Sequence, residues 1–288
     1  MINALTFDIE DYFQVEAFKQ HISYDEWTRY PSRVVENTQK LLGIVDEHGV
    51  KATFFILGWV AERFPALVEQ IAASGHEIAT HGYAHQMVYT QTPADFEADL
   101  AKSLDILTKI SSGPILGYRA PTYSIIEESF WAFDILLKYD LLYDSSIFPI
   151  THDRYGVPQG ERFPYQIHGK DGKILIEFPL STLRLLKWNL PIAGGGYLRL
   201  LPYWMLKKGL HHLNHHQHPG NIYLHPWELD PDQPRIPNIA WTTRMRHYLH
   251  LHSTAEKLRK LLRDFEFAPI RDVLHLSEGA SAAATSER

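Results

Sequence analysis

The sequence predicts an α/β fold built on a parallel sheet, either closed as a barrel or doubly wound, and three observations support it. Short apolar runs alternate with amphipathic stretches of helical length over residues 2–144. The connections between them are short, as in sheets whose parallel strands are joined by crossover helices. Ionisable residues follow directly after several apolar runs, which is where functional side chains gather in parallel α/β folds.

The elements of the first half follow one another regularly. Strands are predicted at residues 2–7, 52–57, 76–80, 115–118 and 141–143, and helices at residues 33–48, 61–73, 93–111 and 128–138. Gly49 and Gly75 are expected to end the first two helices, because glycine adopts the left-handed conformation that commonly ends a helix. Pro93 is expected to open the third helix, in which Phe96 and Leu100 begin an apolar stripe at helical spacing.

The regular alternation ends after Ile147, where a long stretch rich in proline, glycine and aromatic residues begins. This part contains predicted strands at 173–179 and 221–224 and a predicted helix at about 243–264. The glycine run from Gly194 to Tyr197 is interpreted as a tight turn or loop. Pro202 opens a helix whose histidines are expected to form a solvated face, namely His211, His212, His215, His216 and His218. Residues 276–288 are expected to be a disordered tail.

Composition restricts the classes of function. A chain of 288 residues can bury a sizeable core as one large or two small domains. The net charge of -6 gives no electrostatic reason to expect nucleic acid or anionic lipid as a partner. The absence of cysteine excludes disulfides, thiolate nucleophiles and thiolate metal ligands. No signal peptide or transmembrane run is recognised, so we expect a cytoplasmic protein; its oligomeric state is left open.

Polar side chains follow five of the predicted strands, and we expect them to form one site. In chain order they are Asp8, Glu10 and Asp11, then His81 and His85, then Arg119, then Asp144, and finally His225. The two histidines alone are weak evidence, because the chain contains 17. Together with a carboxylate, however, two imidazoles form a ligand set for a zinc-like ion that keeps open positions. The remaining groups are a second carboxylate, an arginine and a distant histidine.

The order of these motifs resembles the polysaccharide deacetylases with a NodB homology domain, carbohydrate esterase family 4. The matching segments are Thr6-Phe7-Asp8, His81 to His85, Arg119-Ala120-Pro121 and Leu224-His225, with Asp144 a weaker match to the family's fourth motif. The segments Asp8 to Phe13, Gly194 to Tyr197 and His225 to Glu228 look like the branch found in bacterial exopolysaccharide (PEP-CTERM) gene clusters.

The resemblance implies an irregular (β/α) barrel of roughly seven parallel strands with a C-terminal extension. It implies one catalytic unit over residues 1–275, in which 1–150 hold the core motifs and 151–275 supply His225. The implied reaction is metal-dependent removal of acetyl from N-acetylhexosamine units of a polysaccharide or its precursor, in exopolysaccharide biosynthesis. The favoured ion is zinc, with cobalt, nickel, manganese and iron as alternatives.

The resemblance also assigns roles to residues. Asp8 would be the general base, Arg119 would keep Asp8 ionised, and His225 would be the general acid, with Asp144 favouring its charged form. His81 and His85 would hold the metal with a carboxylate that is either Glu10 or Asp11. Strand geometry favours Glu10, since residues i and i+2 point to the same side. The source of the backbone oxyanion donor is left open, because Thr122 separates the third-motif proline from the aromatic Tyr123.

Some of these residues could instead have purely structural roles. Arg119 could form a structural ion pair, and Asp144 could cap a helix or a turn. Candidate carbohydrate contacts are Pro121, Tyr123, Tyr197 and Trp227, although most aromatic residues belong to the core. Two other functions fit the same fold: hydrolysis of a small amide, as in allantoinase-like proteins, and sugar binding without catalysis.

Overall fold

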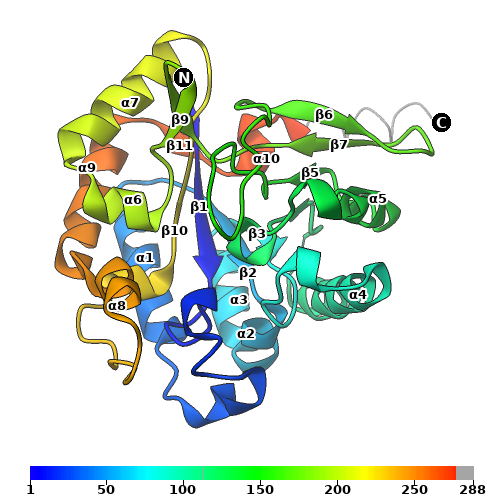
Figure 1. The fold of residues 1–288 in the computed structure, drawn as a ribbon, viewed down its shortest axis with the longest axis horizontal. Helices are drawn as coiled ribbons and strands as arrows, with labels where there is room; N and C mark the ends of the chain where they lie inside the picture. Colours follow the sequence, from blue (N-terminus) through cyan, green and yellow to red (C-terminus); the bar gives the residue numbers. More distant parts are fainter. Residues whose placement is uncertain (112, 277–288) are drawn as a thin grey trace.

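The computed structural model describes residues 1–111 and 113–276, and it contains a curled, mainly parallel sheet covered by helices (Figure 1). The strand order is β10-β1-β2-β3-β4-β5-β7-β6, and the short strand β11 also pairs with β1. Every pairing in this sheet is parallel except that of β6 with β7. Among the described residues β10 and β6 remain edge strands, so the sheet is a half-barrel. The predicted α/β class and the roughly seven parallel strands are confirmed.

The parallel strands are short and buried. They are β1 (Asn3–Ile9), β2 (Thr53–Ile56), β3 (Glu77–Thr80), β4 (Gly117–Tyr118), β5 (Tyr143–Asp144), β7 (Ile174–Glu177), β10 (Asn221–Leu224) and β11 (Phe267–Ala268). Their register brings the functional segments to one level. Phe7 pairs with Leu224, so Asp8 and His225 follow side by side, and Ile9, Ile56 and Thr80 form one row that precedes the first histidine of the pair.

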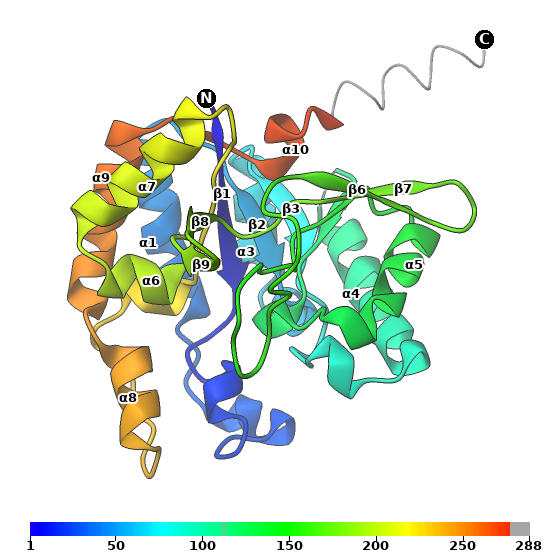
Figure 2. The ribbon, with the colours of Figure 1, turned by 45° about the horizontal axis from the view of Figure 1, so that its top comes forward.

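The helices pack around the outside of the curl, with α1 and α9 on one flank and α4 and α5 on the other (Figures 1 and 2). Those of the first half are α1 (Val34–Glu47), α2 (Gly58–Arg63), α3 (Pro65–Ala73), α4 (Pro93–Ile110) and α5 (Trp131–Lys138). The single helix expected at 61–73 is wrong, because Pro65 cannot donate a backbone hydrogen bond and Phe64 before it leaves the helical conformation, with φ -130° and ψ 57°.

The second half contains the predicted helix after Pro202, which is α7 (Tyr203–His215), and two helices, α8 (Trp241–Tyr248) and α9 (Thr254–Asp264), where one was expected. It also contains elements that were not predicted, namely the strand β6 (Tyr165–His168), an antiparallel hairpin of β8 (Thr182–Leu185) and β9 (Trp188–Pro191), and helices α6 (Gly195–Leu200) and α10 (Ile270–Val273). The single helix expected at 243–264 is also wrong, since His250 adopts a left-handed φ of 57° between α8 and α9. Apart from its first residue, Leu276, the tail expected at 276–288 lies outside the described residues.

The glycine run is only partly a turn. Gly194 has a positive φ of 92°, but Gly195 and Gly196 begin α6. At two of these positions only glycine fits, because neighbouring side chains lie too close to the backbone for a Cβ atom. A Cβ on Gly194 would lie 2.1 Å from the ring of Tyr223, and one on Gly195 would lie 1.6 Å from the carboxylate of Glu228. The expectation of a loop at these residues is therefore corrected to a helix start held against the strand-end residues of β10.

Candidate active site

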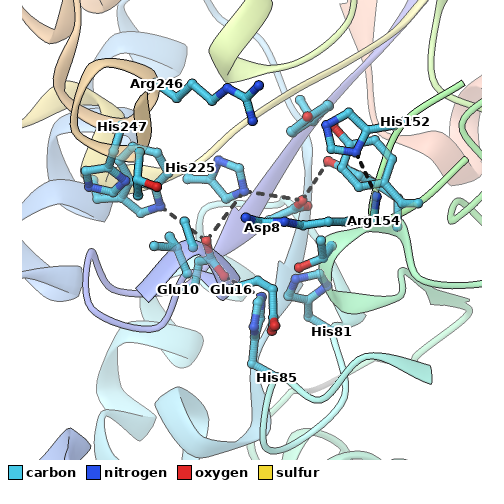
Figure 3. Close-up of a pocket in the computed structure, with 18 residues that line it drawn as sticks. Asp8, Glu10, Glu16, His81, His85, His152, Arg154, His225, Arg246 and His247 are labelled. Atoms are coloured by element: carbon cyan, nitrogen blue, oxygen red, sulfur yellow. Dashed lines mark hydrogen bonds and ion pairs between the residues drawn. The ribbon is translucent and has the colours of Figure 1, made fainter. Parts of the chain in front are cut away.

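A cavity of about 240 Å³ lies at the carboxyl ends of β1, β3 and β10, where the register places the functional segments (Figure 3). Asp8, Glu10, His81, His85 and His225 all line it. The first four are almost fully buried, and the side chain of His225 is 18% exposed. The structure thus brings together residues that lie up to 217 positions apart in the chain.

Three of these residues form a group that could hold a metal ion. Ligand atoms of Glu10, His81 and His85 all lie within 4.8 Å of one another. The buried Oε2 of Glu10 is 2.7 Å from Nε2 of His85, yet it accepts no hydrogen bond of acceptable geometry. A buried carboxylate oxygen without a donor is costly unless a cation is close, so this atom fits a metal ion.

The ligand histidines are oriented by their surroundings. Nδ1 of His81 lies 2.8 Å from the carbonyl oxygen of Arg119; as the donor, it leaves Nε2 free as a ligand. Burial lowers the pKa of His81 to about 4, which keeps its ring neutral as metal binding requires. Burial disfavours the charged form of Glu10, but His85 and His225 outweigh it and lower the pKa of Glu10 to about 2.

The segment between the two histidines is a loop that folds back, one of the two conformations its spacing allows. Asp99 on α4 shapes it by accepting hydrogen bonds from the backbone N–H groups of Tyr83, at 2.7 Å, and Ala84, at 3.0 Å. Gly82 has a φ of 72°, and a Cβ there would lie 2.8 Å from Asp99. His85 itself has a left-handed φ of 52°. Asp99 is thus a positioning residue that the sequence analysis missed.

Asp11 lies outside the metal group. Its carboxylate accepts hydrogen bonds from the hydroxyl of Ser32, at 2.6 Å, and from the backbone N–H groups of Arg33 and Val34, at 2.9 and 3.2 Å. It also accepts one from the N–H of Tyr12. Ser32, Arg33 and Val34 lie at the start of α1, where a carboxylate complements the helix dipole. The structure therefore places Asp11 as a helix cap, and of the two candidate carboxylates only Glu10 faces the histidines.

Asp8 is held by a buried cation. Nη1 of Arg119 donates to Oδ1 of Asp8 at 2.7 Å, and the hydroxyl of Tyr123 donates to Oδ2 at 3.2 Å. The fully buried guanidinium also donates to Thr6, Ser145 and Asn221. Burial opposes ionisation of Asp8, but the charge of Arg119, aided by the two histidines His81 and His225, outweighs it and lowers the pKa of Asp8. Arg119 thus keeps Asp8 charged and fixes its direction.

His225 is paired with a carboxylate that the sequence analysis overlooked. Its Nδ1 lies 2.7 Å from Oε1 of Glu228, which also accepts the backbone N–H of His225 at 3.0 Å. Nε of Arg199 donates to the other oxygen of Glu228 at 2.7 Å. Burial disfavours the imidazolium, but Glu10, Glu228 and Asp8 outweigh it and raise the pKa of His225 to about 9. The signal in the sequence was a glutamate three positions after the histidine.

Asp144 does not line the cavity, which corrects its expected place beside His225. It is fully buried at the end of β5, where it accepts a hydrogen bond from the hydroxyl of Ser146 at 2.6 Å. Burial raises the pKa of both Asp144 and its neighbour Glu177. Burial therefore favours the neutral form of both carboxyls more than solvent would. The charge expected of Asp144 comes instead from Glu228.

The expected carbohydrate contacts divide in two. Tyr123 and Trp227 line the cavity, whereas Pro121 and Tyr197 do not. Nε1 of Trp227 donates to Glu10 at 3.2 Å, and the Trp227 ring stacks on His225 and His247. The sequence analysis also missed several lining residues, among them Glu16, His152, Arg154, Tyr155, Arg246 and His247. Arg154 and Arg246 lie on different sides of the group of lining residues in Figure 3.

Two family models match this chain. Residues 4–136 match the family described as polysaccharide deacetylase, and residues 145–275 match a domain of unknown function (DUF3473). The 18 lining residues are divided equally, with nine from each matched region.

Curated relatives match parts of the chain. A peptidoglycan-N-acetylglucosamine deacetylase of Bacillus cereus is 35% identical over 99 residues, which are 34% of this chain and 36% of the relative. A peptidoglycan deacetylase of Helicobacter pylori is 29% identical over 135 residues, which are 46% and 45% of the two chains. A chitooligosaccharide deacetylase of Sinorhizobium fredii is 42% identical over 48 residues, 17% of this chain and 22% of the relative. These matches thus span less than half of the relatives' length.

Solved structures share the fold over most of the chain. A candidate polysaccharide deacetylase from Mycobacterium smegmatis has a TM-score of 0.65 at 20% identity, with 96% of this chain and 90% of that chain covered. The allantoinase PuuE has a TM-score of 0.61 at 14% identity, with 94% and 87% covered. At these identities the likeness concerns the fold alone. Within residues 1–111 and 113–276, no helix has the length and apolar character needed to cross a membrane.

Proposed function

Because the chain contains a polysaccharide deacetylase domain of the NodB type at residues 4–136, we propose that it removes acetyl groups from N-acetylhexosamine units of a glycan. The products are acetate and a free amine on the sugar. The single observation that carries the proposal is the cavity in which Asp8, the Glu10-His81-His85 group and His225 meet. It holds a base, a ligand set and an acid around one space, as amide hydrolysis requires.

A divalent ion held by Glu10, His81 and His85 would act as a Lewis acid on the acetamide carbonyl and activate water. Two imidazoles and one carboxylate suit zinc, with cobalt, nickel, manganese and iron as alternatives. The unsatisfied Oε2 of Glu10 supports the fit of such an ion.

Asp8 is proposed to accept the proton of the attacking water. The carboxylate is ionised at neutral pH because Arg119 lowers its pKa against the effect of burial. Arg119 and Tyr123 each donate to one of its oxygens, so the remaining lone pairs face the cavity in a fixed direction. A general base of this kind contributes about 10²–10⁴-fold to the rate.

His225 is proposed to donate a proton to the departing amine. The contact between its Nδ1 and Glu228 leaves Nε2 directed to the cavity, 3.9 Å from Oδ2 of Asp8. Glu228 favours the charged, donating form of the ring, and Arg199 keeps Glu228 ionised. The proposed base and the proposed acid thus lie close together on the wall of one cavity.

The two matched regions are proposed to form one catalytic unit over residues 1–275. Support comes from the equal share of the cavity wall and from the pairing of β10 with β1. The proposed setting is exopolysaccharide biosynthesis, with a polysaccharide or its precursor as substrate. This setting is suggested by the likeness of the segments around Asp8 and His225 to that branch of the family.

Acetate release from chitooligosaccharides, measured with and without a chelator, tests the proposal. We expect release that the chelator abolishes and that added zinc restores. Allantoin hydrolysis without acetate release would instead identify a small-amide hydrolase. Saturable glycan binding without either product would identify a binding module. A matched Asp8→Asn variant should bind metal but lose most turnover.

A further inference from the structure

The surface around the β8–β9 hairpin combines exposed apolar side chains with an unusual charge distribution. Thirteen large apolar residues of the described chain are exposed, and seven of them fall between positions 185 and 205. They are Leu185, Leu186, Trp188, Leu190, Leu200, Trp204 and Met205. Exposed apolar side chains are ordinary when scattered, but a concentration of them marks an interaction surface.

The hairpin packs against α7. In the register of the hairpin, Leu185 faces Trp188 and Leu183 faces Leu190, so all four side chains share one face. A Cβ on Gly209 of α7 would lie 3.0 Å from Leu183, which places this face against α7. The outer pair, Leu185 and Trp188, is more than half exposed to solvent. Figures 1 and 2 show the hairpin beside α6 and α7 in both views.

The hairpin turn contains a strained and exposed leucine, which is unfavourable for folding. Leu186 is 89% exposed and has a left-handed φ of 56°. Glycine or asparagine would relieve that strain, and a polar residue would avoid the exposed apolar surface. The Leu186 side chain gains apolar contacts only when another apolar surface covers the turn.

The charges of the side chains around the hairpin indicate which kind of partner covers this surface. The chain carries a net charge of -6, yet residues 178–227 contain five lysines and arginines and no aspartate or glutamate. Lys187 lies at the turn, 5.5 Å from the Trp188 ring, and Lys208 lies 5.3 Å from the Trp204 ring. Neither lysine forms an ion pair within the described residues. Two of the five cations are paired with acids from outside this segment, Arg199 with the buried Glu228 and Lys207 with Asp264, so Lys187 and Lys208 remain as the lysines available to an anionic partner.

We propose that this surface docks on an anionic lipid bilayer, with Leu186 and Trp188 entering the interface and the lysines facing lipid phosphates. Leucine, tryptophan and lysine on one protruding face are the side chains that bind the interfacial region of a membrane. Nucleic acid would use the lysines but would leave the leucines exposed. The proposal does not depend on the reaction catalysed in the cavity.

Vesicle flotation tests the proposal. We expect the wild-type chain to float with vesicles of phosphatidylcholine and phosphatidylglycerol, and to float much less with phosphatidylcholine alone or at raised salt. The double variant Leu186→Ser, Trp188→Ser should bind at least about tenfold more weakly. Trp241→Ser is the matched control, because Trp241 is 71% exposed on α8, outside this surface.

Further measurements distinguish a loss of membrane binding from a loss of folding or activity. Circular dichroism and acetate release from a soluble chitooligosaccharide should be the same in the double variant as in the wild type. Lys187→Glu with Lys208→Glu should weaken vesicle binding without altering either. The proposal is overturned if the wild type ignores anionic vesicles, or if Trp241→Ser loses as much binding as the double variant. A concentration-dependent dimer, or a nucleic-acid complex, that the double variant abolishes while vesicle binding is absent would equally overturn it.

Discussion

Replacing Arg119 with methionine should reverse the sign of the pH dependence that Asp8 gives to the stability of the metal-free protein. In the wild type the folded-state pKa of Asp8 is lowered. Asp8 therefore stabilises the fold above its unfolded pKa of about 3.9, and this contribution is lost as pH falls through the lowered value. Without Arg119, burial is the largest remaining influence on Asp8, so we expect the pKa of Asp8 to be raised in the variant. Stability is then lost as pH rises through that raised value.

The magnitude follows from the burial of the pair. Both side chains are almost completely buried, and their charged atoms are 2.7 Å apart. Removing one partner of such a pair costs about 3–5 kcal/mol, because the other charge remains in the interior. Below the raised pKa the folded variant takes up a proton, so about 1.4 kcal/mol should be recovered per pH unit down to about pH 3.9.

Urea unfolding of the chelator-treated protein at pH 7 and pH 5, followed by circular dichroism, measures both effects. The double variant Asp8→Asn, Arg119→Met is the control, since it loses the same guanidinium contacts but carries no titrating group at position 8. The gap between the single and double variants should narrow as pH falls. A gap that stays constant, or a single variant within about 1 kcal/mol of the wild type at pH 7, would refute the reasoning.

Three further predictions concern the cavity. Glu228→Gln should lower kcat more at pH 8 than at pH 6, because the imidazole it contacts loses a charge that raises its pKa; an unchanged pH profile would contradict this. Gly195→Ala should also lower kcat more at pH 8 than at pH 6, because the added Cβ displaces the carboxylate of Glu228. Gly196→Ala is the control and should match the wild type, since no atom lies within 4 Å of its added Cβ. Asp11→Asn should keep the metal in equilibrium dialysis but lose about 1 kcal/mol in urea unfolding. Glu10→Gln should lose the metal, and the opposite pattern in these two variants would reject the ligand assignment.

The domain of unknown function gains a physical role from this arrangement. Its residues provide half of the cavity wall and include the proposed acid, His225. Arg199 on α6 connects Glu228 to the end of α8 by donating to the carbonyl oxygens of Arg246, His247 and Leu249. Substitutions in α8 are therefore expected to alter the contact between Glu228 and His225, although α8 contributes no residue to the metal group.

The sequence alone determined the fold class and the strand ends that form the candidate site. Buried parallel strands are short apolar runs, and the residue that follows each run is necessarily at the carboxyl edge of the sheet. Asp8, His81, Arg119 and His225 could therefore be located by counting along the chain. The parallel register then brings them together without further information from the sequence.

Tertiary structure alone decided between neighbouring carboxylates. Glu10 and Asp11 are adjacent, and the choice depends on Ser32 and the start of α1, more than 20 residues later, which engage Asp11. Asp144 ends β5 and Glu228 follows β10, but burial raises the pKa of the first, while Arg199 lowers the pKa of the second against the effect of burial. The charge and hydrogen bonding of a carboxylate depend on groups distant in the sequence, so periodicity and spacing predict where it lies but not which role it takes.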